Sequence, residues 1–196
     1  MKKLLGIIGV IVVIAFFAYK FFVGFYNTGI EYQENAKTAW SKVESAYQRR
    51  ADLIPNLVNT VKGYAAHEKS TLEAVIKARA AATQTKIDPT NITPEQLAKF
   101  QQAQQGLSGA LSRLLVTVEK YPDLKADKHF SELQSQLEGT ENRIKVERDR
   151  YNDAVNVFNK HIKKFPGNLL ASMFGFKEMA RFQSDKGAEK APKVEF

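Results

Sequence analysis

Three histidines and scattered carboxylates are the side chains of this sequence that could do acid–base or metal chemistry. His67 and Glu68 begin a pattern of the type H-E-x-x-H, in which two histidines hold zinc and the glutamate acts as general base. Position 71 is a threonine, so the second histidine is missing. His129 and His161 lie among charged neighbours, and we interpret them as surface histidines. Because the sequence also lacks nucleophile and phosphate-loop motifs, we predict a protein that is not an enzyme and that has no metal and no cofactor.

The charge and cysteine content narrow the function further. The chain has 196 residues, a formal net charge of +8 and no cysteine, which excludes disulfides and thiolate chemistry. Lys2, Lys3 and Lys20 account for three of the 29 basic residues, which leaves 26 against 21 acidic ones, or +5, for the rest. Nucleic-acid-binding proteins usually gather their basic residues into a stripe, and here both signs are interleaved. We therefore predict no binding to nucleic acid.

The first 25 residues predict a transmembrane anchor. Residues 4–25 are apolar except for Lys20, and as a helix they would be about 33 Å long, enough for a hydrocarbon core of roughly 30 Å. A cleaved signal peptide is the alternative, but phenylalanines occupy the −3 positions of the candidate sites after Ala18 and Gly24. The lysines at positions 2 and 3 favour a cytoplasmic N-terminus, so we expect the bulk of the chain outside the cytoplasm. The side chains predicted to face the lipid bilayer are Leu4, Ile7, Ile8, Val10, Ile11, Val12, Val13, Ile14, Phe16, Phe17, Phe21 and Phe22.

Beyond the anchor the pattern predicts an all-α fold, because apolar residues recur at steps of three and four. We expect a bundle domain over residues 26–165, with long helices at about 26–51, 52–86, 94–121 and 127–165. A short amphipathic helix at 166–183 and a disordered tail at 184–196 would follow. Thr93 to Gln96 forms a capping box with Pro94 at the first helical position, Asp127 is a candidate N-cap, and Asn168 could cap the last helix.

Pro55 decides the expected number of helices. In the interior of a helix it would lose a hydrogen bond and press on the carbonyl of Ala51, at a cost of about 3 kcal/mol. A helix that begins at Asp52 would instead hold Pro55 in its first turn, with Arg49 and Arg50 ending the preceding helix. We therefore prefer an antiparallel four-helix up-down bundle. A three-helix arrangement, with its first helix kinked at Pro55, is the alternative.

Several short motifs resemble the LemA family of bacterial membrane proteins over nearly the whole chain. They are W-x-x-V at 40–43, R-R-A-D-L-I-P-N-L-V at 49–58, V-K-G-Y-A-A-H-E at 61–68, K-A-R-A at 77–80, E-K-Y-P at 119–122, R-x-x-Y-N at 148–152 and F-P-G at 165–167. The resemblance implies an all-helical, single-pass protein of the bacterial inner (cell) membrane. It implies no enzymatic activity, and a magnetosome-associated branch links the family to membrane shaping.

Two sets of residues are candidates for function. Polar residues on or beside the packing seams could form a buried network that fixes helix register or receives a partner, or could simply be a solvated flank. They are Arg50, Glu68, Arg79, Glu141, Glu147, Arg148, Asn152 and Asn159. The residues predicted to make assembly or partner contacts are Trp40, Tyr47, Arg50, Asp52, Pro55, Glu68, Arg148 and Asn152. Basic and apolar residues near the C-terminus suit a lipid interface, or a helix that closes the open end of the bundle. They are Lys163, Lys164, Leu169, Leu170, Met173, Phe174 and Phe176.

These observations predict a non-enzymatic, membrane-anchored scaffold that forms homo-oligomers and acts in membrane organisation or remodelling. The alternative is an adaptor that docks a specific membrane or envelope protein on the face of its bundle.

Overall fold

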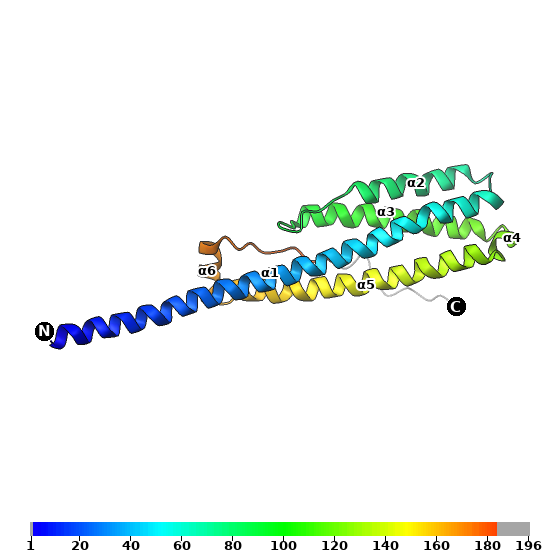
Figure 1. Ribbon diagram of the computed structural model, residues 1–196. Coiled ribbons are helices and arrows are strands. Elements are labelled where there is room, and N and C mark those ends of the chain that lie inside the picture. Colours follow the sequence, from blue (N-terminus) through cyan, green and yellow to red (C-terminus); the bar gives the residue numbers. More distant parts are fainter. Residues whose placement is uncertain (1, 184–196) are drawn as a thin grey trace, which may run out of the picture. The chain divides into compact units, whose positions relative to one another are not determined.

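The computed structural model describes residues 2–183, and all regular structure in that range is helical (Figure 1). The predicted disordered tail at 184–196 lies outside the described residues. In chain order the helices are α1 (Lys2–Tyr64), α2 (Lys69–Gln84), α3 (Pro94–Val118), α4 (Pro122–Lys125), α5 (Lys128–Lys163) and α6 (Gly167–Phe174). The all-α prediction is therefore confirmed, as is the long apolar helix at the N-terminus.

The chain divides into two compact units, which are described separately. Within the described residues, unit 1 comprises residues 2–49, Pro89–Asn91 and Thr140–Met179. Unit 2 comprises Arg50–Asp88, Ile92–Gly139 and residues 180–183. The two longest helices, α1 and α5, each contribute one part to each unit.

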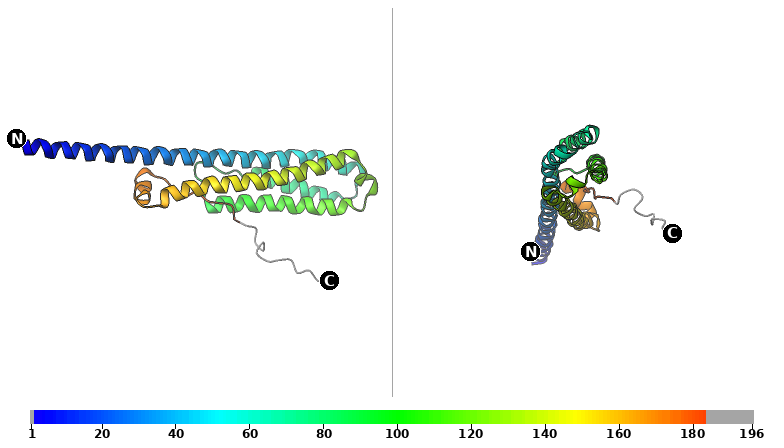
Figure 2. Two further views of the ribbon diagram at one scale, coloured as in Figure 1. Left: turned by 90° about the horizontal axis from the view of Figure 1, so that it is seen from below. Right: turned by 90° about the vertical axis from the view of Figure 1, so that its right-hand side faces the viewer.

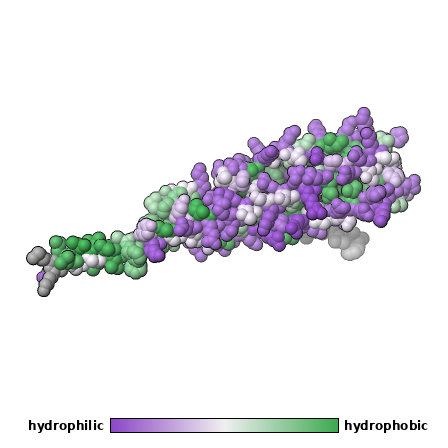
Figure 3. All heavy atoms as spheres, in the orientation of Figure 1, coloured by the Kyte–Doolittle hydropathy of each residue, from purple (hydrophilic) through white to green (hydrophobic). Residues whose placement is uncertain are grey.

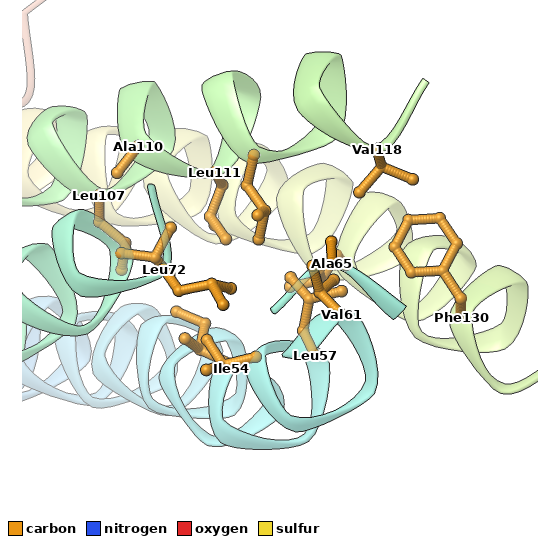
Figure 4. Close-up of a cluster of buried hydrophobic side chains, with 14 of the residues drawn as sticks. Ile54, Leu57, Val61, Ala65, Leu72, Leu107, Ala110, Leu111, Val118 and Phe130 are labelled. Atoms are coloured by element: carbon orange, nitrogen blue, oxygen red, sulfur yellow. The ribbon is translucent and has the colours of Figure 1, made fainter. Parts of the chain in front are cut away.

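Unit 2 has an apolar core to which each of its helical segments contributes (Figure 4). Along α3 the residues at steps of three and four are buried, namely Leu97, Phe100, Gln104, Leu107, Leu111, Leu114 and Val118, as the periodic pattern predicts. Burying a Leu, Ile or Val side chain contributes about 1.5–3 kcal/mol, so this cluster dominates the stability of the unit. Its largest members are Ile54, Leu57, Val61, Leu72, Val75, Leu107, Leu111, Leu114, Val118, Leu124, Phe130 and Leu137.

Unit 1 is built from the N-terminal part of α1, the C-terminal part of α5 and α6 (Figure 2). Trp40 and Tyr151 are fully buried and meet edge to face, with ring centroids 5.3 Å apart. Val43, Val155 and Phe158 are also fully buried. The apolar period that predicted helices here therefore also identifies the core of the unit.

The break that we predicted between Ala51 and Asp52 does not occur. α1 runs without interruption through Pro55 to Tyr64. The kinked alternative correctly continued the helix through Pro55, but its helix to residue 86 is interrupted by a turn at 65–68, after which α2 begins. The physical reason lies on α2, where Arg79 donates from Nε to the carbonyl of Ala51 over 2.7 Å. This is the carbonyl that Pro55 leaves without its helical donor, so Arg79 replaces the lost hydrogen bond.

The predicted helix caps were right at two of three positions. At Thr93 the capping box is complete, since the Thr93 hydroxyl accepts from the backbone of Gln96 and the Gln96 side chain accepts from the backbone of Thr93. Asp127 caps α5 by accepting from the amide of Phe130 at 2.8 Å. The third helix ends at Val118, earlier than predicted, and the short α4 follows it.

The C-terminal helix is shorter than predicted, and Asn168 is not its cap. α6 begins at Gly167, after Pro166, and ends at Phe174. Gly175 adopts a φ of 74°, the left-handed conformation that suits glycine, and the amide of Phe176 then donates to the carbonyl of Ala171 at 2.9 Å. The chain therefore leaves the helix at Gly175, and residues 176–183 follow without regular structure.

Candidate membrane-boundary site

The N-terminal part of α1 presents apolar side chains that the structure leaves uncovered (Figure 3). All twelve residues predicted to face lipid, from Leu4 to Phe22, are exposed. Within residues 2–183, α1 is the single helix that is long and apolar enough to cross a membrane. A core helix of a soluble protein would be mostly buried, whereas here none of the apolar stretch is buried.

Aromatic rings gather where this apolar stretch ends. Phe25 and Tyr26 of α1 pack against Phe174, the last residue of α6, with centroid distances of 6.2 Å and 5.2 Å. The same two rings lie 6.4 Å and 5.9 Å from Phe176. We call Phe25, Tyr26, Phe174 and Phe176 the aromatic clasp. Each such ring pair contributes about 0.5–1.5 kcal/mol beyond its buried area, so the clasp fixes α6 beside α1.

Polar contacts hold the same region together. His161 of α5 stacks on Phe25 at 4.3 Å, and its Nε2 lies 3.0 Å from the carbonyl oxygen of Phe25. In the tautomer protonated at Nε2, the ring donates to that oxygen. The Asn159 side chain donates to the carbonyl of Met179 and accepts from its amide, at 2.9 Å and 3.0 Å. The surface interpretation of His161 is therefore wrong, because the side chain is half-buried between neighbours.

Two glycines permit the close approach of these segments. A Cβ at Gly29 of α1 would lie 2.7 Å from the ring of Phe176. A Cβ at Gly167 would lie 2.6 Å from the carbonyl oxygen of His161 and 2.8 Å from the ring of Phe25. Any larger residue at either position would push the clasp apart. Sequence reasoning missed both glycines, because the aromatic rings that they meet, Phe176 and Phe25, are distant from them in the sequence.

A second polar arrangement lies inside unit 2. Arg50 is 1% exposed, and its guanidinium donates to the side-chain oxygens of Gln104 at 2.6 Å and Ser108 at 3.0 Å. Gln104 in turn donates to the carbonyl of Ala82 at 3.3 Å. The network joins α1, α2 and α3, so it fixes how these three helices are aligned.

Residues 39–196 match the family model described as the LemA family. The chain belongs to the LemA family. It is similar to magnetosome protein MamQ 2 of Paramagnetospirillum magneticum, with 31% identity over 91% of this chain and 71% of the relative. It is also similar to magnetosome protein MamQ of Magnetospirillum gryphiswaldense, with 29% identity over 80% and 64% of the two chains. Protein LemA of Metamycoplasma hominis is 26% identical over 86% of this chain and 73% of its own.

In this LemA-family chain the residues predicted for assembly fall into buried and exposed groups. Trp40 and Tyr47 are buried within unit 1, and Arg50 is buried within unit 2. Glu68 is half-buried and accepts from the hydroxyl of Tyr121 at 3.1 Å. The others are more accessible: Asp52 and Pro55 are exposed, and Arg148 and Asn152 are half-buried.

The residues predicted for the lipid interface also fall into exposed and buried groups. Leu169 and Met173 of α6 are exposed, whereas Leu170 is buried in unit 1. Phe174 and Phe176 are half-buried in the clasp. Lys163 and Lys164 are both exposed, and Lys163 forms an ion pair with Glu178 at 2.5 Å. One face of α6 therefore belongs to the core and the other to the surface.

One buried carboxylate lies on α5 of the LemA-family chain. Glu147 is 2% exposed in its side chain, and its Oε1 lies 3.1 Å from Nε of Arg143 and 2.9 Å from Nη1 of Arg150. These residues are four and three positions away on the same helix, the spacing at which side chains meet. The second oxygen, Oε2, has no hydrogen-bond partner in the described part of the chain.

Asp127 combines a helix cap with a link to the end of α1. Its Oδ1 accepts from the amide of Phe130, and its Oδ2 accepts from the hydroxyl of Tyr64 at 2.8 Å. The Phe130 amide and then the Tyr64 hydroxyl lower the pKa of Asp127, since both stabilise the carboxylate. The same bond raises the pKa of the Tyr64 hydroxyl.

Proposed function

We propose that this LemA-family protein is a non-enzymatic, membrane-anchored helical scaffold that self-associates and acts in membrane organisation. The observation that carries the proposal is the uncovered apolar stretch of α1. Twelve large side chains there are exposed, and burying them would contribute on the order of 20 kcal/mol at about 1.5 kcal/mol each. That exceeds the net stability of an ordinary domain, about 5–15 kcal/mol, so the stretch has to be covered.

A lipid bilayer suits this stretch better than a protein groove does. Residues 4–25 span about 33 Å as a helix, close to the roughly 30 Å of hydrocarbon in a bilayer. The apolar side chains surround the helix on all sides, whereas a groove would require one apolar face. Phe25 and Tyr26 stand at the end of the stretch, where aromatic residues are enriched at membrane–water interfaces.

Self-association is the second part of the proposal. Anchored chains meet in the plane of the membrane, where their effective concentration is high, so even a weak contact between copies gives assemblies. Two of the named relatives are magnetosome proteins, and from this similarity we propose that the chain acts in membrane organisation. We place the chain in the bacterial inner membrane, with most of it on the extracytoplasmic side.

Purification of the full chain in mild detergent tests the scaffold. Light scattering on the purified particle should give a homogeneous homo-oligomer, and intersubunit crosslinks should form in membranes before extraction. A monomer that retains a stoichiometric heterologous protein would contradict self-association and would support the adaptor instead.

Orientation has its own test because the sequence contains no cysteine. In whole cells, a membrane-impermeant maleimide should label Lys77→Cys, an exposed position on α2, and should leave Lys3→Cys unlabelled. The opposite pattern would place the bulk of the chain in the cytoplasm.

A further inference from the structure

α6 carries an apolar face that nothing in unit 1 covers. Leu169 and Met173 are one helical turn apart, and their exposed fractions are 64% and 62%. Phe165, just before the helix, is 82% exposed. Leu170 and Ala171 are buried instead. The helix is therefore apolar on both its inner and its outer face.

The clasp determines where this outer face lies along α1. Phe174 and Phe176 contact Phe25 and Tyr26, the residues at which the apolar stretch of α1 ends. Gly29 and Gly167 remove the side chains that would hold the segments apart. When residues 4–25 cross the hydrocarbon core, α6 must lie at the boundary between acyl chains and headgroups.

The positive charge around α6 suits an anionic membrane surface. Between residues 160 and 179 there are four lysines and one acid, Glu178, which pairs with Lys163. Lys160, Lys164 and Lys177 are exposed and have no acidic partner among the described residues of this segment. A basic residue near an anionic membrane surface contributes about 1 kcal/mol to binding.

We propose that α6 is an interfacial helix whose outer face, Phe165, Leu169 and Met173, inserts into the anionic leaflet next to Phe25. The flanking lysines lie among the lipid phosphates, and the clasp keeps the helix parallel to this surface. The proposal rests on the anchor of the proposed function. Two other occupants of the face, a second copy of the chain and a soluble protein, lack the bilayer's continuity with the apolar stretch of α1.

Single-cysteine reporters on the full chain test this placement. The protein is reconstituted into vesicles of phosphatidylethanolamine and phosphatidylglycerol, and an NBD fluorophore is attached to Leu169→Cys or Met173→Cys. Nitroxide-labelled lipids should quench both reporters, as they should quench Ile11→Cys in the anchor. Val146→Cys is the matched control, because Val146 is an exposed apolar residue on α5 about 22 Å along the helix from His161. It should not be quenched.

The outcomes separate the two proposals. If the reporter at position 11 is quenched and those at 169 and 173 are not, the interfacial role of α6 is overturned and the anchor stands. If position 11 is not quenched, the anchor and the proposed function fail together. Disulfide formation between copies of Leu169→Cys, with no quenching at either α6 position, would assign the face to a second copy.

Lipid composition tests the role of the lysines. Replacing phosphatidylglycerol by phosphatidylcholine should reduce quenching at positions 169 and 173 and leave position 11 unchanged. A double variant, Lys164→Glu and Lys177→Glu, should have the same effect in anionic vesicles. Equal quenching at position 169 under all conditions would overturn the electrostatic part of the proposal.

Discussion

Removal of the Arg79 side chain should reveal how α1 accommodates a proline in its interior. Pro55 has no amide hydrogen, so the carbonyl of Ala51 lacks its helical donor and accepts from Nε of Arg79 at 2.7 Å instead. Ala51 is 3% exposed, so water cannot easily replace the guanidinium. A hydrogen bond to a charged group contributes about 1.5–3 kcal/mol, and we expect Arg79→Ala to lower the free energy of unfolding by about 2 kcal/mol.

Arg79→Ala should lower the free energy of unfolding by a smaller amount in a chain that lacks Pro55. In a Pro55→Ala chain, the amide of residue 55 can donate to the carbonyl of Ala51, so the loss of Arg79 leaves no unsatisfied group. We then expect a cost below about 1 kcal/mol and a coupling free energy of about 1 kcal/mol or more. Pro55→Ala alone should stabilise the protein, since proline is about 3 kcal/mol less favourable than alanine in a helix interior.

The assay is a double-mutant cycle on the full chain in mild detergent, with urea unfolding followed by far-UV circular dichroism. Lys77→Ala, on an exposed face of the same helix, is the matched control and should change stability by no more than about 0.5 kcal/mol. A coupling below about 0.5 kcal/mol would refute the reasoning, because independent sites add to within that margin.

Three further predictions concern the polar network, the clasp and the cap of α5. Arg50→Met should destabilise the protein by about 3 kcal/mol in urea unfolding, because it removes the hydrogen bonds to the buried Gln104 and the half-buried Ser108. Arg49→Ala, at an exposed position, should be nearly neutral. Gly29→Ala should loosen the clasp and accelerate tryptic cleavage near α6, whereas Gly24→Ala, which has open space around it, should not. The pKa of Asp127 is lower in the folded protein than in the unfolded chain. The carboxylate therefore contributes its full stabilisation above the unfolded-state pKa of about 3.9, and this stabilisation is lost as the pH falls through the folded-state pKa. Asp127→Asn should therefore flatten the acid limb of the stability curve, and an unchanged acid limb would contradict this assignment.

Local signals in the sequence predicted some local features of the fold, although the cap predicted at Asn168 is not formed. Thr93 and Asp127 were identified as caps because a cap depends on residues three positions away, all of which the sequence shows together. The exposed apolar run of α1 was predictable for the same reason, since length and composition are sufficient for it.

Features that depend on distant residues could not be predicted in this way. The continuity of α1 requires the guanidinium of Arg79, 28 positions beyond Ala51, which no helix rule applied to Pro55 can take into account. The clasp requires Gly29 to meet Phe176, a contact between residues that no local pattern connects. Leu169 and Leu170 are adjacent and chemically identical, and only the packing of α6 decides that one is exposed and the other buried.

The part of α1 from Arg50 to Tyr64 is continuous only because other helices of unit 2 pack against it. An isolated helix with this sequence would lose a hydrogen bond at Ala51 and would favour the break that the local rules predict. Arg79 supplies that bond only when α2 is packed in place, so the continuous helix and the turn at 65–68 must form together. The network of Arg50, Gln104 and Ser108 couples the same segment to α3. Unit 2 gains rigidity from this arrangement, because α1 cannot bend at Pro55 without the loss of contacts on α2 and α3.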